Sequence, residues 1–149
     1  MTFLLSAAAL ACAARLIWVD LRRLEIETPT LLLLGAALFL QSAHTEGIEG
    51  LLPRLLAAGG FYLALRLIIR HVRGMGRVGA GDPPLIGVIS FMVFPLLVPW
   101  AIVAAGLILL TAAAYARARR KRFLRSMFPA APPLLLAALP FYLYGLGGG

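Results

Sequence analysis

The sequence predicts an all-α membrane protein: one domain over residues 1–149, built as a bundle of about six transmembrane helices with both termini outside the cytoplasm. Of its 149 residues, 62% are hydrophobic and 13% are charged, and the mean hydropathy is +0.94. A soluble domain carries about 25% charged residues. The segments 29–43 and 99–116 contain no charged residue at all. Soluble enzyme folds are therefore excluded.

Six apolar segments are candidates for membrane-spanning helices. A helix needs about 20 residues to cross a hydrocarbon core of about 30 Å, and shorter segments cross where neighbouring helices shelter them. The second and fourth candidates are short, at about 15 residues each. The six candidate spans are 2–19, 29–43, 51–70, 83–97, 99–116 and 129–146.

The first three spans are defined by what bounds their apolar runs. The run 2–19 lacks the basic residues that precede the apolar part of a cleaved signal peptide, so we expect a retained helix. Thr28 and Pro29 suit the N-cap and the first turn of the second span. The third span, 51–70, follows an acidic connection and ends among arginines.

The last three spans have equally clear limits. Asp82 and Pro83 are a favourable helix start, because Asp caps a helix and Pro needs no hydrogen-bond partner in its first turn. An uncharged tight turn over 95–100 is expected between the fourth and fifth spans. A proline-containing segment, 128–132, precedes the last apolar run.

The charges of the connections alternate, which supports the count of six independently of hydropathy. Thirteen of the fourteen Lys and Arg residues fall near the first, third and fifth connections, and only Arg54 falls near another. Because basic connections stay in the cytoplasm, these three face inward and both termini face outward. The run 117–125 carries six of these charges. A topology anchor that also contacts anionic lipid explains it better than a nucleic-acid site does.

Two of the six acidic residues, Asp20 and Asp82, are candidates for catalysis. Asp20 ends the first predicted span and Asp82 opens the fourth, so both lie at the cytoplasmic edge of the membrane. Two carboxylates that meet in such a site share a proton, and the pair can serve as general base and general acid on a water molecule. Their meeting requires the first and fourth spans to pack together. The structural alternatives are a helix cap at Asp82 and an ion pair of Asp20 with Arg22 or Arg23.

A glycine-rich segment, 74–82, leads into Asp82. It contains the pattern GxGxxG, but no strand precedes it and no acidic residue follows about 20 positions later, so a dinucleotide site is excluded. We expect Gly79 and Gly81 to give the segment the backbone freedom to admit a substrate strand beside Asp82, as a gate.

No metal ion or other cofactor is expected. The single Cys12 excludes both an internal disulfide and a zinc site of paired cysteines. The two histidines, His44 and His71, are predicted to lie on opposite sides of the membrane. They therefore cannot share a metal ion.

The motifs resemble those of a known family. The segment Gly79-Ala80-Gly81-Asp82 matches the GxGD motif of membrane aspartyl proteases. Asp20, followed six residues later by Ile26, resembles the first motif of the type IV prepilin peptidases, and 128–132 is similar to the start of their last helix. The resemblance spans most of the chain, and its motifs follow one another in the same order as in the family. No cysteine-rich cytosolic domain precedes the first span. In this respect the chain resembles the short, single-domain members of the family that serve Tad-type pili.

This resemblance implies a multi-pass aspartyl endopeptidase of the bacterial inner membrane. Its substrate would be a prepilin or pilin-like precursor whose short basic leader is cut at the cytoplasmic face, with Asp20 and Asp82 as catalytic residues. N-methylation is not implied, and neither is a nucleic-acid partner. Glu25 and Glu27 are the other cytosolic acids, so we expect them to attract the basic leader.

Two departures from the family pattern leave alternatives open. Glu27 and Thr28 stand where the family has Pro-Asn, and Pro84 stands where it has Lys. A degenerate paralogue that binds without cutting is therefore one alternative, and a non-enzymatic subunit of a membrane assembly is another. A proton-coupled carrier is disfavoured, because carriers place acids within spans and these lie at span ends.

Overall fold

The computed structural model of the chain describes residues 2–71, 82–118 and 129–147, which form six α-helices and no strand. The predicted all-α class is confirmed. Three helices, α1, α3 and α5, contain segments long and apolar enough to cross a membrane. The helices are α1 (Thr2–Arg23), α2 (Thr28–Thr45), α3 (Gly47–His71), α4 (Asp82–Val93), α5 (Leu97–Ala118) and α6 (Ala131–Gly147).

Helix α1 is longer than the predicted span 2–19. It continues to Arg23, so that Asp20 lies inside the helix, one turn before its end. The Arg22 guanidinium stacks over the Trp18 ring at 4.1 Å, one helical turn away. Such a pair, together with basic residues at the negative end of the helix dipole, extends the helix beyond its apolar run.

The acidic connection predicted before the third span is almost entirely helical in the structure. Helix α2 continues to Thr45 and α3 begins at Gly47, which leaves only Glu46 between them. Gly47 has a φ of 67°, in the left-handed region that glycine adopts at little cost. Arg54 holds this corner in place, because it pairs with Glu46 and donates a hydrogen bond of 3.0 Å to the carbonyl of Phe91, near the end of α4.

The predicted turn over 95–100 is shorter in the structure. Helix α4 ends at Val93 and α5 begins at Leu97, so Trp100 lies within α5. The Trp100 side chain is buried, and its indole N–H donates to the Leu134 carbonyl of α6 at 3.4 Å. Trp100 therefore joins the first turn of α5 to α6.

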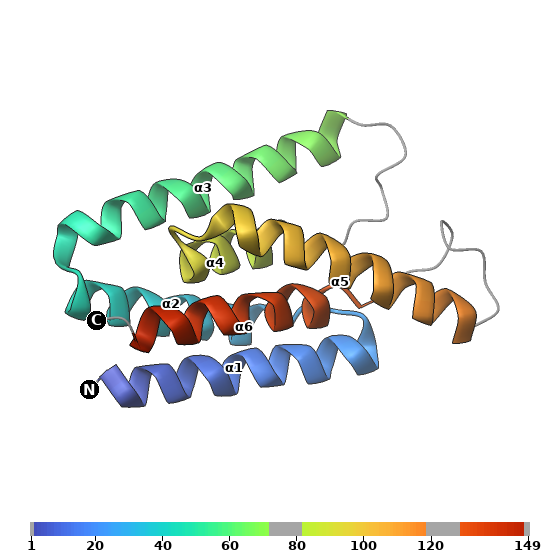
Figure 1. The fold of residues 1–149 in the computed structure, drawn as a ribbon, viewed down its shortest axis with the longest axis horizontal. Coiled ribbons are helices and arrows are strands. Elements are labelled where there is room, and N and C mark those ends of the chain that lie inside the picture. The colour runs from blue at the N-terminus through green and yellow to red at the C-terminus, as the bar shows by residue number, and fades with distance from the viewer. Residues whose placement is uncertain (1, 72–81, 119–128, 148–149) are drawn as a thin grey trace.

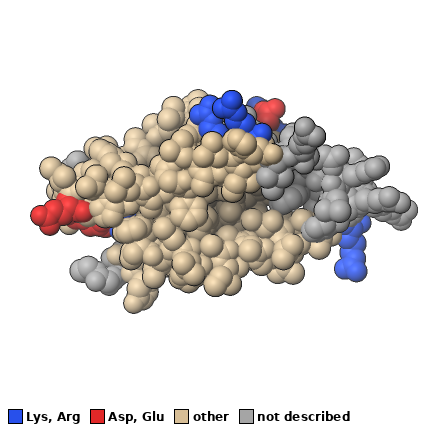
Figure 2. All heavy atoms as spheres, turned by 90° about the horizontal axis from the view of Figure 1, so that it is seen from above, with Lys and Arg blue, Asp and Glu red and all other residues tan. Residues whose placement is uncertain are grey.

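Successive helices run in opposite directions, and α4 occupies the centre of the bundle (Figure 1). Helix α4 packs against α2, α3, α5 and α6, and Leu85, Ile89 and Ser90 on it are fully buried. Most of the visible surface carries no charged side chain, and the charged groups form a few separate clusters (Figure 2). Helix α3 buries none of its residues. The uncharged part of this face suits contact with lipid.

Helix α3 approaches α4 closely at one glycine. A Cβ atom placed on Gly87 would lie 3.3 Å from the carbonyl oxygen of Ala58 and 3.4 Å from the Cβ of Tyr62. Small residues at such points let helix backbones approach within a membrane. The packing of α3 therefore depends on the absence of a side chain at position 87.

Candidate functional site

Asp20 is a buried carboxylate held by another helix. Its side chain points into the bundle, and the residue is only 4% exposed. The main-chain N–H of Ala131, at the start of α6, donates a hydrogen bond of 2.7 Å to its Oδ2 atom. The N–H of Ala130 contributes a second interaction with the same carboxyl group. Neither ion pair in the described residues involves Asp20, so the alternative of an ion pair with Arg22 or Arg23 is not observed.

Asp82 is the first residue of α4 and is partly exposed. It lies close enough to Asp20 for the two side chains to interact electrostatically. The structure thus brings together two residues that are far apart in the sequence. A buried and a partly exposed carboxylate within electrostatic range of each other are compatible with an aspartyl dyad.

The two aspartates approach each other without direct packing of their helices. Across the described residues, α1 packs against α2 and α6, and α4 packs against α2 and α6, but α1 and α4 make no contact with each other. The packing of the first and fourth spans against each other, on which the meeting of the two aspartates was expected to depend, is therefore not observed. Helices α2 and α6 each pack against both α1 and α4, and all four helices have one end at this side of the bundle (Figure 1).

Glu27 is already paired within the chain. Arg15 donates to it twice, from Nε at 2.7 Å and from Nη2 at 3.0 Å, and the Thr30 hydroxyl donates to the same carboxylate. The hydrogen bonds from Arg15 and Thr30 lower the pKa of Glu27 from 4.5 to about 2. Glu25 is exposed in the same connection between α1 and α2. A basic leader would have free access to Glu25 but would compete with Arg15 for Glu27.

Two other predicted site residues, Gly79 and Gly81, lie outside the described residues, as does most of the basic run 117–125. The gate therefore stays a prediction. Pro84, two residues after Asp82, lines a cavity.

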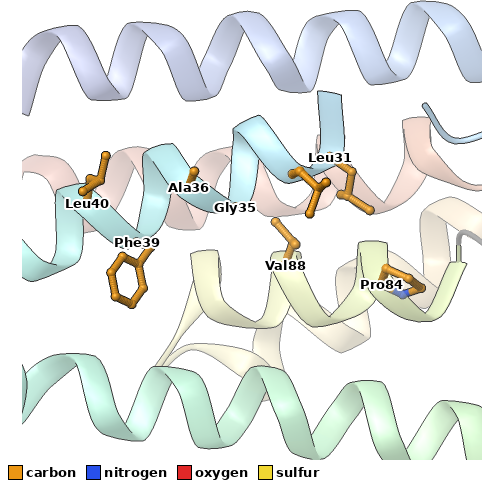
Figure 3. A pocket seen from close by; sticks show the side chains of 8 residues that line it. Leu31, Gly35, Ala36, Phe39, Leu40, Pro84 and Val88 are labelled. Carbon is orange, nitrogen blue, oxygen red and sulfur yellow. The ribbon is translucent and has the colours of Figure 1, made fainter. Parts of the chain in front are cut away.

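An apolar cavity of about 470 Å³ opens between α2 and α4 (Figure 3). Its α2 wall includes Leu31, Gly35 and Phe39, and its α4 wall is Pro84 and Val88. An adjoining cavity of about 300 Å³ shares four of these residues and reaches Phe91 and α3. The two form one apolar groove along α4 that begins two residues after Asp82.

A metal site is not formed by the described residues, which contain no cluster of three or more His, Cys, Asp or Glu side chains. The groups that can act chemically are the two carboxylates. A pair of this kind can activate a water molecule by taking its proton and can protonate a leaving group.

Sequence reasoning missed the main-chain N–H groups at the start of α6. Their signal is a helix start without a capping side chain: Ala130 and Ala131 precede Pro132 and Pro133, which have no N–H to donate. Such a start needs a hydrogen-bond acceptor from elsewhere in the chain. Asp20 is that acceptor.

Comparison of the chain with known protein families, curated proteins and solved structures finds no match.

Proposed function

We propose that the chain is an aspartyl endopeptidase of the bacterial inner membrane, which crosses the membrane six times. It removes the short basic leader of prepilin or pilin-like precursors at the cytoplasmic face and does not methylate the product. The observation that carries this proposal is the buried Asp20, held by α6 and in electrostatic contact with Asp82.

The chemistry follows from two carboxyl groups that share one proton. The ionised group removes a proton from a water molecule as the water oxygen attacks the carbonyl carbon of the scissile peptide. The protonated group donates its proton to the leaving nitrogen as the C–N bond breaks. The products are a carboxylic acid and an amine, and the dyad regains its single shared proton.

The apolar groove supports a substrate with a hydrophobic helix. Pro84 and Val88, one helical turn apart on α4, form its wall, so that the groove leads away from Asp82 along the helix. A precursor whose hydrophobic segment lies in the groove would present its adjoining leader at the carboxylates. Exposed Glu25 then offers negative charge to the basic leader on the same side.

A cleavage assay in membranes tests the proposal. Wild-type protein and the variants Asp20→Asn and Asp82→Asn are mixed with a pilin-like precursor, and mass spectrometry locates the cut. The wild type is expected to release the leader, and both variants are expected to lose activity. Glu49→Gln, at an exposed acid on α3, is the matched control and should cut normally. Full cleavage by either aspartate variant contradicts the proposal.

A second candidate is a non-enzymatic subunit of a membrane assembly. It is favoured by one observation, the hydrogen bond through which Asp20 caps α6, because that bond has structural value without any catalysis. In the same assay, this candidate predicts that the wild-type protein cuts no precursor.

A further inference from the structure

The starts of α4 and α6 both contain two prolines, but they differ in where the hydrogen-bond acceptor for their N–H groups comes from. Helix α4 begins Asp82-Pro83-Pro84 and carries an acidic side chain in its own first turn. Helix α6 begins Ala131-Pro132-Pro133, with no side chain of its own able to accept a hydrogen bond. Its first available N–H, that of Ala131, points at a carboxylate oxygen 111 residues earlier in the chain.

The prolines leave α6 with few other ways to hold Asp20. Pro132 and Pro133 have no N–H, and the N–H of Leu134 already bonds to the Ala130 carbonyl at 3.4 Å. Among the first four residues of the helix, Ala131 alone therefore has an N–H to offer Asp20. The positive end of the α6 dipole faces the same carboxylate.

We infer that the main-chain N–H of Ala131 is a positioning group for the catalytic pair. It holds the Oδ2 atom of Asp20 and so fixes the orientation of the carboxyl group that would share a proton with Asp82. Because α6 packs against both α1 and α4, a single contact fixes Asp20 to the helix that also supports Asp82. This inference rests on the proposed function.

Ala131→Pro removes this N–H and adds a ring at a buried position, with its Cδ atom in place of the hydrogen that faces Asp20. Proline is well tolerated in the first turn of a helix, where its missing N–H breaks no intrahelical bond. Ala130, which becomes the residue before a proline in this variant, lies outside the helix, where the extended conformation that a following proline favours is compatible with a helix start. The second interaction, from Ala130, remains in this variant.

Val98→Pro is the control for the addition of a proline to a helix start. Val98 is 71% exposed in the first turn of α5, directly before Pro99, at the position that Pro132 has in α6. It adds a proline to a helix start without touching Asp20. Circular dichroism of both variants checks that the helices are intact.

Two measurements test the inference, steady-state cleavage and the infrared carboxyl bands of the purified protein. The Asp20 band is the one lost in Asp20→Asn. In Ala131→Pro, kcat is expected to fall about 10- to 100-fold with KM unchanged, because a displaced catalytic group costs rate and leaves binding intact. The Asp20 band is expected to shift as well. Val98→Pro should match the wild type in both measurements.

The outcomes separate this inference from the proposed function. If the wild type cuts and Ala131→Pro matches it in kcat and in the carboxyl band, the inference is overturned and the protease proposal stands. If Ala131→Pro shifts the band while kcat is unchanged, the contact exists but has no positioning role, and the inference is again overturned. If the wild type cuts no precursor, the protease proposal fails. A band shift in that case identifies the contact as a helix cap only, which also overturns the inference.

Discussion

The hydrogen bond between Asp20 and α6 should contribute to the stability of the protein whether or not the protein is an enzyme. Asp20→Asn and Asp20→Ala both remove the negative charge, but only Asn keeps an oxygen that can accept the Ala131 N–H. Since Asp20 is 4% exposed, the alanine variant leaves that N–H buried without this acceptor. The comparison of Asn with Ala therefore isolates the acceptor from the charge.

A buried donor without its partner costs about 1–3 kcal/mol, and loss of a helix cap costs about 0.5–2 kcal/mol. The two figures describe the same contact, so they are not added. We expect Asp20→Ala to be about 1–2 kcal/mol less stable than Asp20→Asn, a factor of about 5–30 in the folded-to-unfolded ratio. Reversible unfolding in detergent micelles, followed by circular dichroism, measures the difference.

A pair of substitutions at an exposed acid provides the control. Glu49→Gln and Glu49→Ala on α3 should differ by less than about 0.5 kcal/mol, because surface substitutions away from special contacts have small effects. Equal stability of Asp20→Asn and Asp20→Ala would refute the reasoning, since the hydrogen bond to α6 would then contribute nothing.

Three further predictions follow from other contacts. The pKa of Glu27 is about 2 in the folded chain against 4.5 ordinarily, so its stabilising contribution is complete above about pH 4.5 and is lost as the pH falls toward 2. The melting temperature of Glu27→Gln should therefore fall less between pH 5 and pH 2.5 than that of the wild type, because the variant has no carboxylate at this position to protonate. Gly87→Val forces a side chain against the backbone of α3 and should destabilise the protein by about 1–3 kcal/mol in the same unfolding assay. Gly35→Leu fills the apolar groove and should raise KM for a precursor several-fold with little change in stability.

Gly106 serves as the control for both glycine substitutions. A Cβ at this position on α5 would meet nothing within 4 Å, so Gly106→Val and Gly106→Leu add the same side chains where space is open. If Gly106→Val destabilises as much as Gly87→Val, the close approach of α3 and α4 is not the cause. An unchanged KM in Gly35→Leu removes the groove from substrate binding.

The helices could be predicted from the sequence because their causes are local. Apolar runs, prolines at helix starts and charges at helix ends placed six helices in the right order. The limits were less accurate where side-chain contacts extend a helix, as the stacking of Arg22 on Trp18 does at the end of α1. Tight corners such as Glu46 also have no strong sequence signal, because they depend on how α2 and α3 pack.

The candidate site was only half predictable. The two aspartates were found from their place at span ends, since a carboxylate at a membrane edge is unusual in itself. Their surroundings depend on contacts between distant segments, such as Asp20 with Ala131, which no local pattern encodes. The pairing of Glu27 with Arg15 was missed for the same reason, because Arg15 was assigned only to topology.

The central claim is that Asp20 and Asp82 act as one catalytic unit, and a double-mutant cycle of cleavage rates tests it most directly. The rates of Asp20→Asn, Asp82→Asn and the double variant are measured on one precursor in membranes. Residues that act as a unit are strongly non-additive, so each single variant should lose as much activity as the double variant. Single variants that each retain activity, with losses that add in the double variant, would contradict the account.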